Sequence, residues 1–288
     1  MKVLRFIAVG LLLGASTVTI SQELSNGYYN YTLNRFNLNP AFAGNRGNIS
    51  ALLNTKSYQG TSNGAPKNTF FGVQGAINEE QGVGLRILSD KRGAYEVGKY
   101  DLAYSHQIKI DEQSDLRFGV SAGLTRRMLN SGSINNVELL NQADPTLASG
   151  YFDESNFIAG IGLVYDYENL QFGLSSPHLI ESGEGISEFW VGTISYIYKI
   201  EETPFSISPL LIYQNLPEID NQYDFLLKTE YKEKAWVQLG YQSNNNLNFG
   251  LGFDIGPLGI GYSYEMTNSD LSNISSGSNE IIIVVSLK

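Results

Sequence analysis

The sequence predicts an all-β protein, an antiparallel transmembrane β-barrel of about 14 strands with short periplasmic turns and longer outer loops. Three observations support this prediction. Apolar residues alternate with small or polar ones in segments such as 116–125, which reads Leu-Arg-Phe-Gly-Val-Ser-Ala-Gly-Leu-Thr. The connections between such segments alternate between short and long. Beyond the N-terminal region, no apolar run approaches the roughly 20 residues that a membrane helix needs.

Residues 1–21 have the layout of a secretory signal peptide. Lys2 and Arg5 give a short positive region, and residues 6–15 form an apolar run that is too short to span a bilayer. Cleavage before Gln22 fits the small and polar residues that precede it. The alternative is a buried N-terminal helix. We expect an exported protein, and because the chain contains no cysteine, it has neither disulfide bonds nor thiol chemistry.

The composition fits a membrane barrel and excludes some partners. The chain has 18 Tyr and 30 Gly, which suit aromatic girdles and closely packed strands. The net charge of -10 argues against nucleic acid or an anionic membrane surface as a partner.

Fourteen segments have the strand pattern, and their typical length suits a tilted membrane crossing of roughly 9–11 residues. In chain order they are 48–58, 67–76, 82–88, 95–109, 115–127, 156–166, 169–175, 188–200, 205–213, 221–231, 235–242, 246–254, 257–265 and 280–288.

The loop lengths sort by the end of the barrel to which they belong. If the first strand runs outward from the periplasm, the outer loops are 59–66, 89–94, 128–155, 176–187, 214–220, 243–245 and 266–279. The periplasmic turns are then 77–81, 110–114, 167–168, 201–204, 232–234 and 255–256. A soluble secreted β-sandwich, which is the alternative fold, has no reason to sort loops in this way.

The two folds also differ in where the apolar strand faces point. A barrel directs them toward lipid, whereas a sandwich buries them between two sheets. We expect lipid contact for Leu116, Phe118, Val120, Leu247, Phe249, Leu251, Leu258 and Ile260. The last strand, 280–288, barely alternates and ends in Lys, which suggests burial on both faces, against something in the lumen.

Several motifs, taken in order, resemble the PorP/SprF family of Bacteroidetes. The segment 28–44 resembles the N-terminal signature of that family, and its core is Asn39-Pro40-Ala41-Phe42-Ala43-Gly44. The other matching motifs are 82–85 with Gly93, Asp144-Pro145, 172–179, 223–228, 261–264 and 277–281. The resemblance covers nearly the whole chain after the signal. Two departures are Asn279, where members often have His, and the missing terminal aromatic residue.

The resemblance implies an outer-membrane protein of the type IX secretion and gliding system. Some members look like core components that associate with a periplasmic ring. Others are dedicated to one large secreted adhesin and engage its C-terminal domain. We therefore divide the chain into a signal peptide (1–21), an N-terminal periplasmic segment (22–47) and an outer-membrane barrel (48–288).

The N-terminal segment has its own local signals. Pro40 fixes its φ angle and biases Asn39 away from helix, and Gly44 permits a turn before the first strand. We expect this segment to cap or enter the periplasmic end of the barrel, with Phe42 buried as an anchor. The alternative is a flexible leader.

The sequence shows no convincing catalytic or metal site, and we expect no cofactor. The chain has two His. His106 lies in a strand beside aromatic residues, where a structural role is expected, and His178 lies in the predicted loop 176–187, where a solvated side chain is expected. A Ser–His lipase remains an unsupported alternative. Asp144, Asp153 and Glu154 lack the spacing of a calcium loop.

One strand face is rich in glycine and arginine. Pairs such as Gly82 and Gly84 leave that face nearly bare, which makes room for a plug, a ligand or another chain. Arg86, Arg117 and Arg127 share this face. They are either lumen charges balanced by carboxylates such as Asp254 and Glu265, or part of a surface that recognises a partner.

These features favour a non-enzymatic barrel that binds and helps to secrete, assemble or anchor a secreted protein such as an adhesin. The expected partners are the adhesin C-terminal domain or other secretion components, together with outer-membrane lipid. A passive barrel for a small solute is the alternative. The candidate partner-binding residues are Asn39, Pro40, Phe42, Gly44, Arg117 and Arg127, together with the outer loops 128–155, 176–187 and 266–279.

Overall fold

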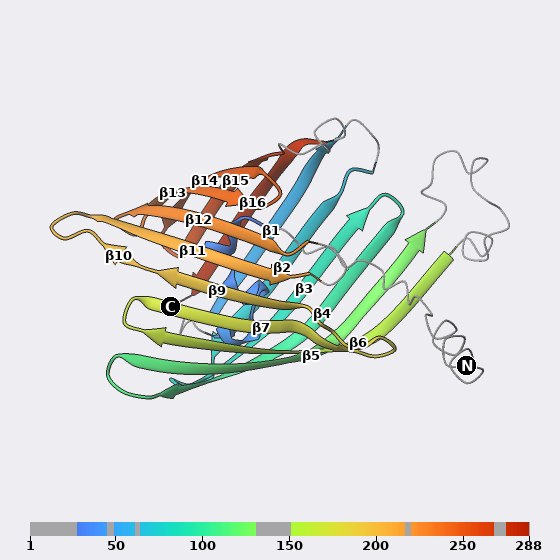
Figure 1. Ribbon diagram of the computed structural model, residues 1–288, viewed down its shortest axis with the longest axis horizontal. Coiled ribbons are helices and arrows are strands. Elements are labelled where there is room, and N and C mark those ends of the chain that lie inside the picture. The colour runs from blue at the N-terminus through green and yellow to red at the C-terminus, as the bar shows by residue number, and fades with distance from the viewer. Residues whose placement is uncertain are drawn as a thin grey trace, which may run out of the picture.

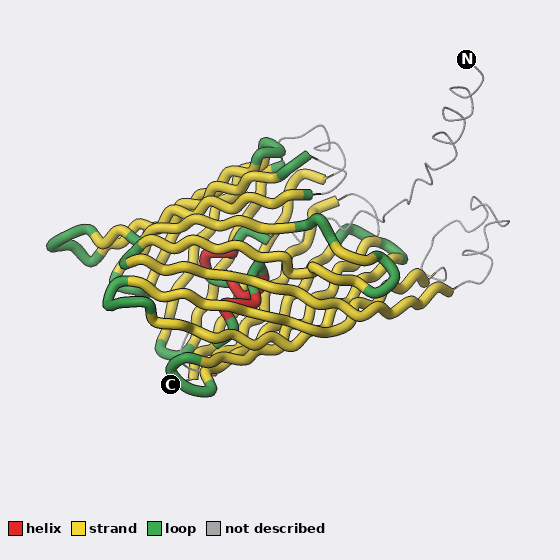
Figure 2. The backbone as a smooth tube through the Cα atoms, turned by 60° about the horizontal axis from the view of Figure 1, so that its bottom comes forward, coloured by secondary structure: helices red, strands yellow, loops and turns green. Residues whose placement is uncertain are grey.

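The computed structural model describes residues 28–44, 49–60, 64–130, 151–216, 220–267 and 275–287. Within these residues, fourteen strands form a closed antiparallel barrel (Figures 1 and 2). Each strand pairs with its neighbours along the chain, and the last strand, β16, pairs with the first, β1, so the barrel has no open edge. Closure rules out a two-sheet sandwich. No helix in the described ranges is both long and apolar enough to cross a membrane.

The barrel strands are β1 (Ile49–Gly60), β2 (Lys67–Ala76), β3 (Gln81–Arg92), β4 (Tyr95–Lys109), β5 (Ser114–Asn130), β6 (Tyr151–Tyr167), β7 (Leu170–Glu181), β9 (Trp190–Tyr196), β11 (Phe205–Asn215), β12 (Gln222–Tyr231), β13 (Ala235–Gln242), β14 (Asn246–Ile255), β15 (Leu258–Met266) and β16 (Ser275–Leu287). Two further strands have two residues each. β8 (Gly185–Ile186) pairs with β7, and β10 (Tyr198–Lys199) pairs with β11.

Each of the fourteen expected segments coincides with one barrel strand, but several strands continue further toward the end that carries the long loops. We call this end the outer end and the opposite end the inner end. The largest difference is in β7, which runs to Glu181 instead of ending at 175. Its pairing with β6 shifts register between Ala159 and Ile161, opposite a bulge that contains Pro177. Because proline cannot donate a ladder hydrogen bond, the sequence predicts that the strand ends before Pro177. In the structure, the pairing of β7 with β6 resumes at Ile180.

This extension of β7 corrects the expectation for His178. The sequence placed this residue in a solvated loop, whereas it lies within β7 and is half-buried. His106 lies in β4, as expected, on the face that also presents Leu102 and Tyr104 to the exterior.

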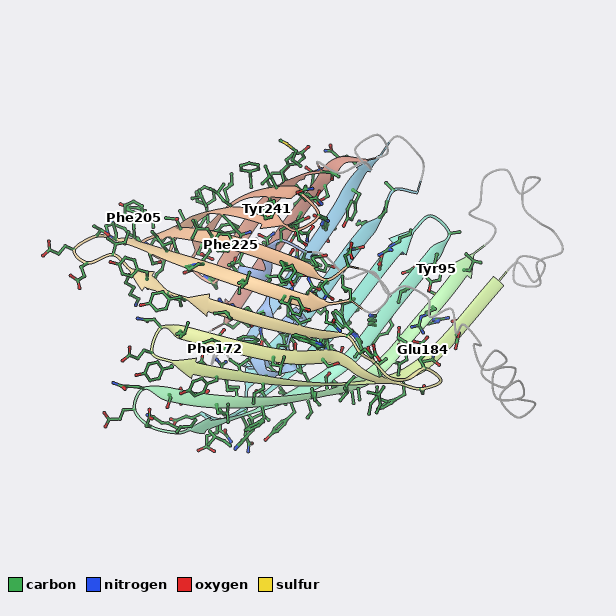
Figure 3. All side chains as sticks on the ribbon, in the orientation of Figure 1. Tyr95, Phe172, Glu184, Phe205, Phe225 and Tyr241 are labelled. Carbon is green, nitrogen blue, oxygen red and sulfur yellow. The ribbon has the colours of Figure 1, made fainter. Side chains whose placement is uncertain are left out.

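The outward faces of the strands are apolar, as the alternation predicts. The exposed residues include Phe118, Val120, Leu247, Phe249, Leu251 and Ile260, while Leu116 and Leu258 are half-buried. Figure 3 shows the aromatic side chains of Phe205, Phe225 and Tyr241 on the outside of the barrel, and all three are exposed. A continuous exterior of this kind is suited to lipid contact.

The last strand is only partly as expected. Ile281 and Ile283 face outward and are exposed, so β16 is not buried on both faces. Ile282 and Val284 face the lumen and are buried in the apolar cluster that the N-terminal segment forms. The apolar character of the inward face therefore comes from contact with chain inside the barrel.

Candidate binding site in the barrel lumen

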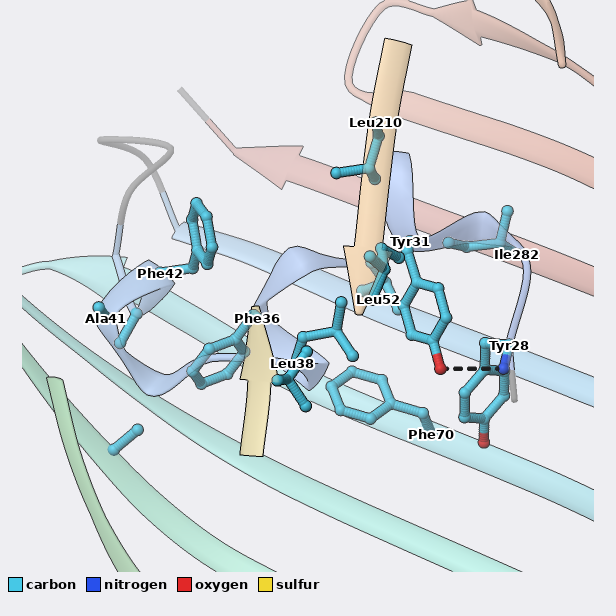
Figure 4. Packing of buried hydrophobic residues seen from close by; sticks show 14 of the residues in the cluster. Tyr28, Tyr31, Phe36, Leu38, Ala41, Phe42, Leu52, Phe70, Leu210 and Ile282 are labelled. Atoms are coloured by element: carbon cyan, nitrogen blue, oxygen red, sulfur yellow. Dashed lines mark hydrogen bonds between the residues drawn. The ribbon is translucent and has the colours of Figure 1, made fainter. Parts of the chain in front are cut away.

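Residues 28–44, which we call the plug, lie inside the barrel. They form three short 3-10 helices, η1 (Asn30–Thr32), η2 (Arg35–Asn37) and η3 (Pro40–Phe42), drawn in red within the strands in Figure 2. Most of the plug is buried, and Phe42 is 4% exposed. Figure 4 shows its aromatic residues packed against side chains of the lumen wall. The plug therefore enters the barrel, and Phe42 is buried as the sequence predicts.

Local chemistry sets the turns of the plug. The side-chain oxygen of Asn39 accepts a hydrogen bond from the Ala41 amide at 2.9 Å and caps η3, with Pro40 in the first turn. Gly44 has a φ of +67°, and a Cβ there would lie 2.6 Å from the Cα of Gly82. Only glycine fits this turn and this close approach.

The inner part of the plug rests on strands β4 to β7. Asn39 donates to the carbonyl of Leu163 at 3.0 Å. Ser175 donates to the carbonyl of Leu38 at 2.7 Å, and Ser105 donates to that of Ala43 at 2.6 Å. The two serine bonds satisfy plug carbonyls, and the three bonds together tie the segment to β4, β6 and β7.

Glycines make room for this backbone. At Gly82, Gly119 and Gly162 an added Cβ would overlap atoms of the plug, and at Gly84 it would lie 2.5 Å from the ring of Phe36. The bare strand face seen in the sequence thus seats the chain's own N-terminal segment. Elsewhere, Gly252 and Gly261 lie against the ring of Trp236.

The first residues of the plug contact a buried carboxylate on the opposite wall. Glu280 accepts hydrogen bonds from the backbone amides of Tyr29, at 2.7 Å, and Asn30, at 3.1 Å. It also accepts from the side-chain amides of Asn30, at 2.9 Å, and Asn54, at 2.8 Å. A buried charge needs such partners, because an unpaired one is costly.

A second charge lies beside this carboxylate. The Lys56 ammonium is 3.0 Å from Glu265, and it lies 4.0 Å from the centre of the Tyr29 ring. Gln238 donates to the carbonyl of Tyr29 at 2.9 Å and accepts from the hydroxyl of Thr32 at 2.7 Å. The plug is thus held by polar and charged groups as well as by apolar packing.

The three inward arginines pair with carboxylates of the adjacent strand or, for Arg127, of the next strand but one. Arg86 bonds Asp101 at 2.7 Å, and it also donates to the carbonyl of Phe36 at 3.0 Å. Arg117 pairs with Asp166. Arg127 pairs with Glu181 at 2.5 Å. The charges of these three arginines are therefore balanced by carboxylates of the same chain, which is the first of the two interpretations considered above. The carboxylates are not Asp254 and Glu265, which the sequence suggested.

Asp254 and Glu265 have other contacts, because the positions of residues on adjacent strands decide which charged side chains meet. Arg86 and Asp101 stand directly opposite each other on β3 and β4. Glu265, on β15, instead pairs with Lys56 of β1, which lies on the far side of β16 in the same wall.

Two guanidinium groups flank Phe42. Those of Arg35 and Arg117 lie 6.0 and 5.4 Å from the centre of its ring. Arg35 also donates to Ser195 at 2.8 Å and to Gln171. Burial lowers the pKa of Arg35 to about 10, so it remains charged at neutral pH.

The structure brings most of the candidate residues together at the inner half of the lumen. Asn39, Pro40 and Gly44 belong to the plug, and Arg117 lies beside Phe42. Arg127 is separate, toward the outer end, where it lies 3.5 Å from Glu184. Of the candidate outer loops, residues 131–150 and 268–274 lie outside the described residues.

Sequence reasoning missed the residues that hold the start of the plug. These are Asn54, Lys56, Gln238 and Glu280. For Glu280 the available signal was a carboxylate on an inward face, directly before a run of Ile and Val. Their common partner could not be seen, because they come from strands far apart in the sequence.

The described residues contain no group of three or more His, Asp or Glu side chains that could hold a metal ion.

Comparison with known proteins adds family and fold. The family model "Type IX secretion system membrane protein PorP/SprF" matches residues 21–285. No curated protein matches the sequence.

Several solved structures share the fold at low identity. The Acinetobacter baumannii outer membrane protein Omp33 has a TM-score of 0.54 and 7% identity, over 83% of this chain and 98% of that one. CymD, a monoaromatic hydrocarbon channel, has a TM-score of 0.56 and 11% identity, over 88% and 92%. A Pseudomonas aeruginosa FadL homologue has a TM-score of 0.50 and 10% identity, over 86% and 91%.

At these identities the solved structures show the barrel fold alone, whereas the family model covers nearly the whole sequence. The protein is therefore an integral outer-membrane barrel, and it belongs to the PorP/SprF family of type IX secretion system membrane proteins.

Proposed function

We propose that this protein binds a polypeptide secreted by the type IX system, such as a large surface adhesin, and helps to secrete, assemble or anchor it without chemical turnover. Membership of the family supports a role in type IX secretion. The observation that carries the proposal is the plug. Its backbone fills part of the lumen, and charged lumen groups such as Arg86 and Glu280 are engaged by contacts within the chain. Such a lumen suits a barrel that holds a partner better than one that passes solutes.

The partner in this proposal is the C-terminal domain of the adhesin or another secretion component, and it meets the outer end of the barrel. In the described part of that end, Glu184 and Ile186 are exposed beyond β7. Arg127 lies beneath them and reaches Glu184. A partner that contacts this rim would compete for the Arg127 guanidinium, which gives this residue a direct role in the proposal.

The other candidate residues have an indirect role. Asn39, Pro40, Phe42 and Gly44 are buried inside the barrel, and Arg117 lies against Phe42. A partner outside the barrel cannot reach them while the plug is in place. We propose that they keep the plug in the position from which the partner is recognised.

Deletion of the gene tests the proposal. Surface display of one or a few large proteins should be lost while the cells still make them. Affinity isolation from detergent-solubilised outer membrane should recover the same proteins with the wild-type barrel. Unchanged surface display and unchanged total secretion would refute the proposal.

Passive transport of a small solute is the second candidate. It is favoured by the shared fold with CymD, which is a monoaromatic hydrocarbon channel. Conductance or solute flux through the purified wild-type protein in a planar bilayer or a vesicle would support it. If deletion also left surface display intact, transport would replace protein binding as the function.

A further inference from the structure

We propose that the lumen wall formed by β1, β13, β15 and β16 is a polypeptide-binding site, and that residues 28–32 occupy it as an internal ligand. We call residues 28–32 the tip of the plug, and residues 35–44 its base. In this proposal a segment of the secreted partner displaces the tip while the base stays in place. The inference rests on the proposed function and names the site at which the partner chain binds.

The contacts of the tip are those by which a protein recognises main chain. Glu280 accepts from two successive backbone amides, those of Tyr29 and Asn30. Gln238 donates to the backbone carbonyl of Tyr29. Because every non-proline residue carries these groups, the same side chains can bind a segment of different sequence.

One contact adds selectivity for an aromatic side chain. Lys56 lies 4.0 Å from the centre of the Tyr29 ring and is held there by Glu265 at 3.0 Å. A desolvated cation of this kind favours Tyr, Trp or Phe over an aliphatic residue. The hydroxyl of Tyr29 also donates to Gln242 at 3.1 Å. The ligand class is therefore an extended or turn segment with two free amides beside an aromatic residue.

The tip and the base are held in different ways. The base lies with its backbone on Gly82 and Gly119, and with the side chains of Asn39 and Pro40 on Gly162, so that no Cβ fits at these three glycines. The polar contacts of the tip come from side chains of a different wall, such as Glu280 and Gln238. The tip can therefore leave its site by breaking side-chain contacts, without moving the backbone of the base.

The residue between the two parts is consistent with this division. Asn34 is buried, and its side-chain nitrogen has no hydrogen-bond partner among the residues that the structure describes. Its oxygen accepts only locally, from the amide of Asn37 at 3.3 Å. The junction is thus not fastened to the barrel wall by the Asn34 side chain.

A disulfide lock tests displacement in the full-length protein. The hydroxyl of Ser263 lies 3.0 Å from the side-chain oxygen of Asn30, and the chain has no native cysteine. The double variant Asn30→Cys/Ser263→Cys should therefore form one disulfide between tip and wall. Locked cells should lose surface display of the partner, and a reductant should restore it. The two single-cysteine variants are the matched controls, and the reductant should not change their surface display of the partner.

The disulfide lock tests this inference, and the gene deletion tests the proposed function, so the two can be refuted separately. If the deletion abolishes display but the fully oxidised lock leaves it intact, the tip is not displaced and this inference is wrong, whereas the proposed function stands. If the deletion has no effect, the proposed function is wrong. Oxidation is checked by a thiol label, and folding by the heat-dependent gel shift of a barrel.

A binding assay keeps the inference testable if the lock does not form. The probe is the fluorescein-labelled peptide Tyr-Tyr-Asn-Tyr-Thr-Leu, which copies residues 28–33. Tyr29→Ala should weaken the internal ligand, so the purified variant should bind this peptide about tenfold more tightly than the wild type does. Adding Glu280→Gln should remove that gain. Equal peptide binding by wild type and Tyr29→Ala would overturn the proposal.

Discussion

Replacing Leu251 with arginine should destabilise the barrel in a bilayer by about 2–4 kcal/mol. Leu251 is the central one of five outward positions on β14, which begin at Leu247 and end at Ile255, and its side chain is 48% exposed on the apolar exterior. Arginine there would place a charge near the middle of the hydrocarbon layer, whereas leucine matches the lipid. The side chain has no carboxylate opposite it, since its cross-strand neighbours are Val237 and Tyr262.

The structure also supplies a matched control on the same strand. Leu247 lies four residues from Leu251, which is about 14 Å along a strand and about 10 Å in depth at a tilt of about 45°. The apolar band of such barrels is about 25 Å tall, so Leu247 lies near its edge. Leu247→Arg should therefore cost only about 0–1 kcal/mol.

The assay is reversible urea unfolding in lipid vesicles, followed by the fluorescence of Trp190 and Trp236 and by the heat-dependent gel shift. The reasoning predicts that the two variants differ by about 1–4 kcal/mol in the free energy of unfolding, with Leu251→Arg the less stable. The lipid-facing assignment of Leu251 would be refuted if both variants lost the same free energy of unfolding. It would also be refuted if Leu251→Arg inserted normally and were as stable as the wild type.

Three further changes test the plug and the lumen. Gly119→Ala should unseat the plug and expose it to limited proteolysis, because a Cβ there would overlap plug backbone, while Gly192→Ala meets only an ordinary contact at 3.5 Å and should not. Phe42→Ala should lower the free energy of unfolding by about 3–5 kcal/mol in urea titration, and a loss under about 1 kcal/mol would show that the ring is no anchor. Arg86→Met should cost about 3–5 kcal/mol because it leaves Asp101 buried and unpaired. The double change with Asp101→Leu should recover most of that loss, and an equal loss in both variants would argue against the ion pair.

The strands could be predicted because a barrel wall is specified locally. Each strand needs an apolar residue at every second position to face lipid, as in β14, and this period is visible in one sequence. The ends of β3 and β7 were harder to place. Their outer halves extend beyond the clear alternation and are held by pairing, as between Lys91 and Glu96, which a single strand does not reveal.

The candidate site was predictable only in part. Asn39, Pro40 and Gly44 form a local turn, so their sequence signal was strong, and the burial of Phe42 followed from it. The partners of the plug could not be predicted in the same way. Glu280 lies 250 positions from Asn30, and no local rule joins them.

The sequence by itself determined the barrel and the family resemblance, because alternation and short motifs are properties of neighbouring residues. Only the tertiary structure decided what the inward faces contact. Closing fourteen strands brings β1, β13 and β16 around the same residues of the plug, so Glu280 meets two backbone amides and Lys56 meets a tyrosine ring. The physical reason is that buried charges take their partners from three-dimensional proximity, and strand closure sets that proximity across the whole length of the chain.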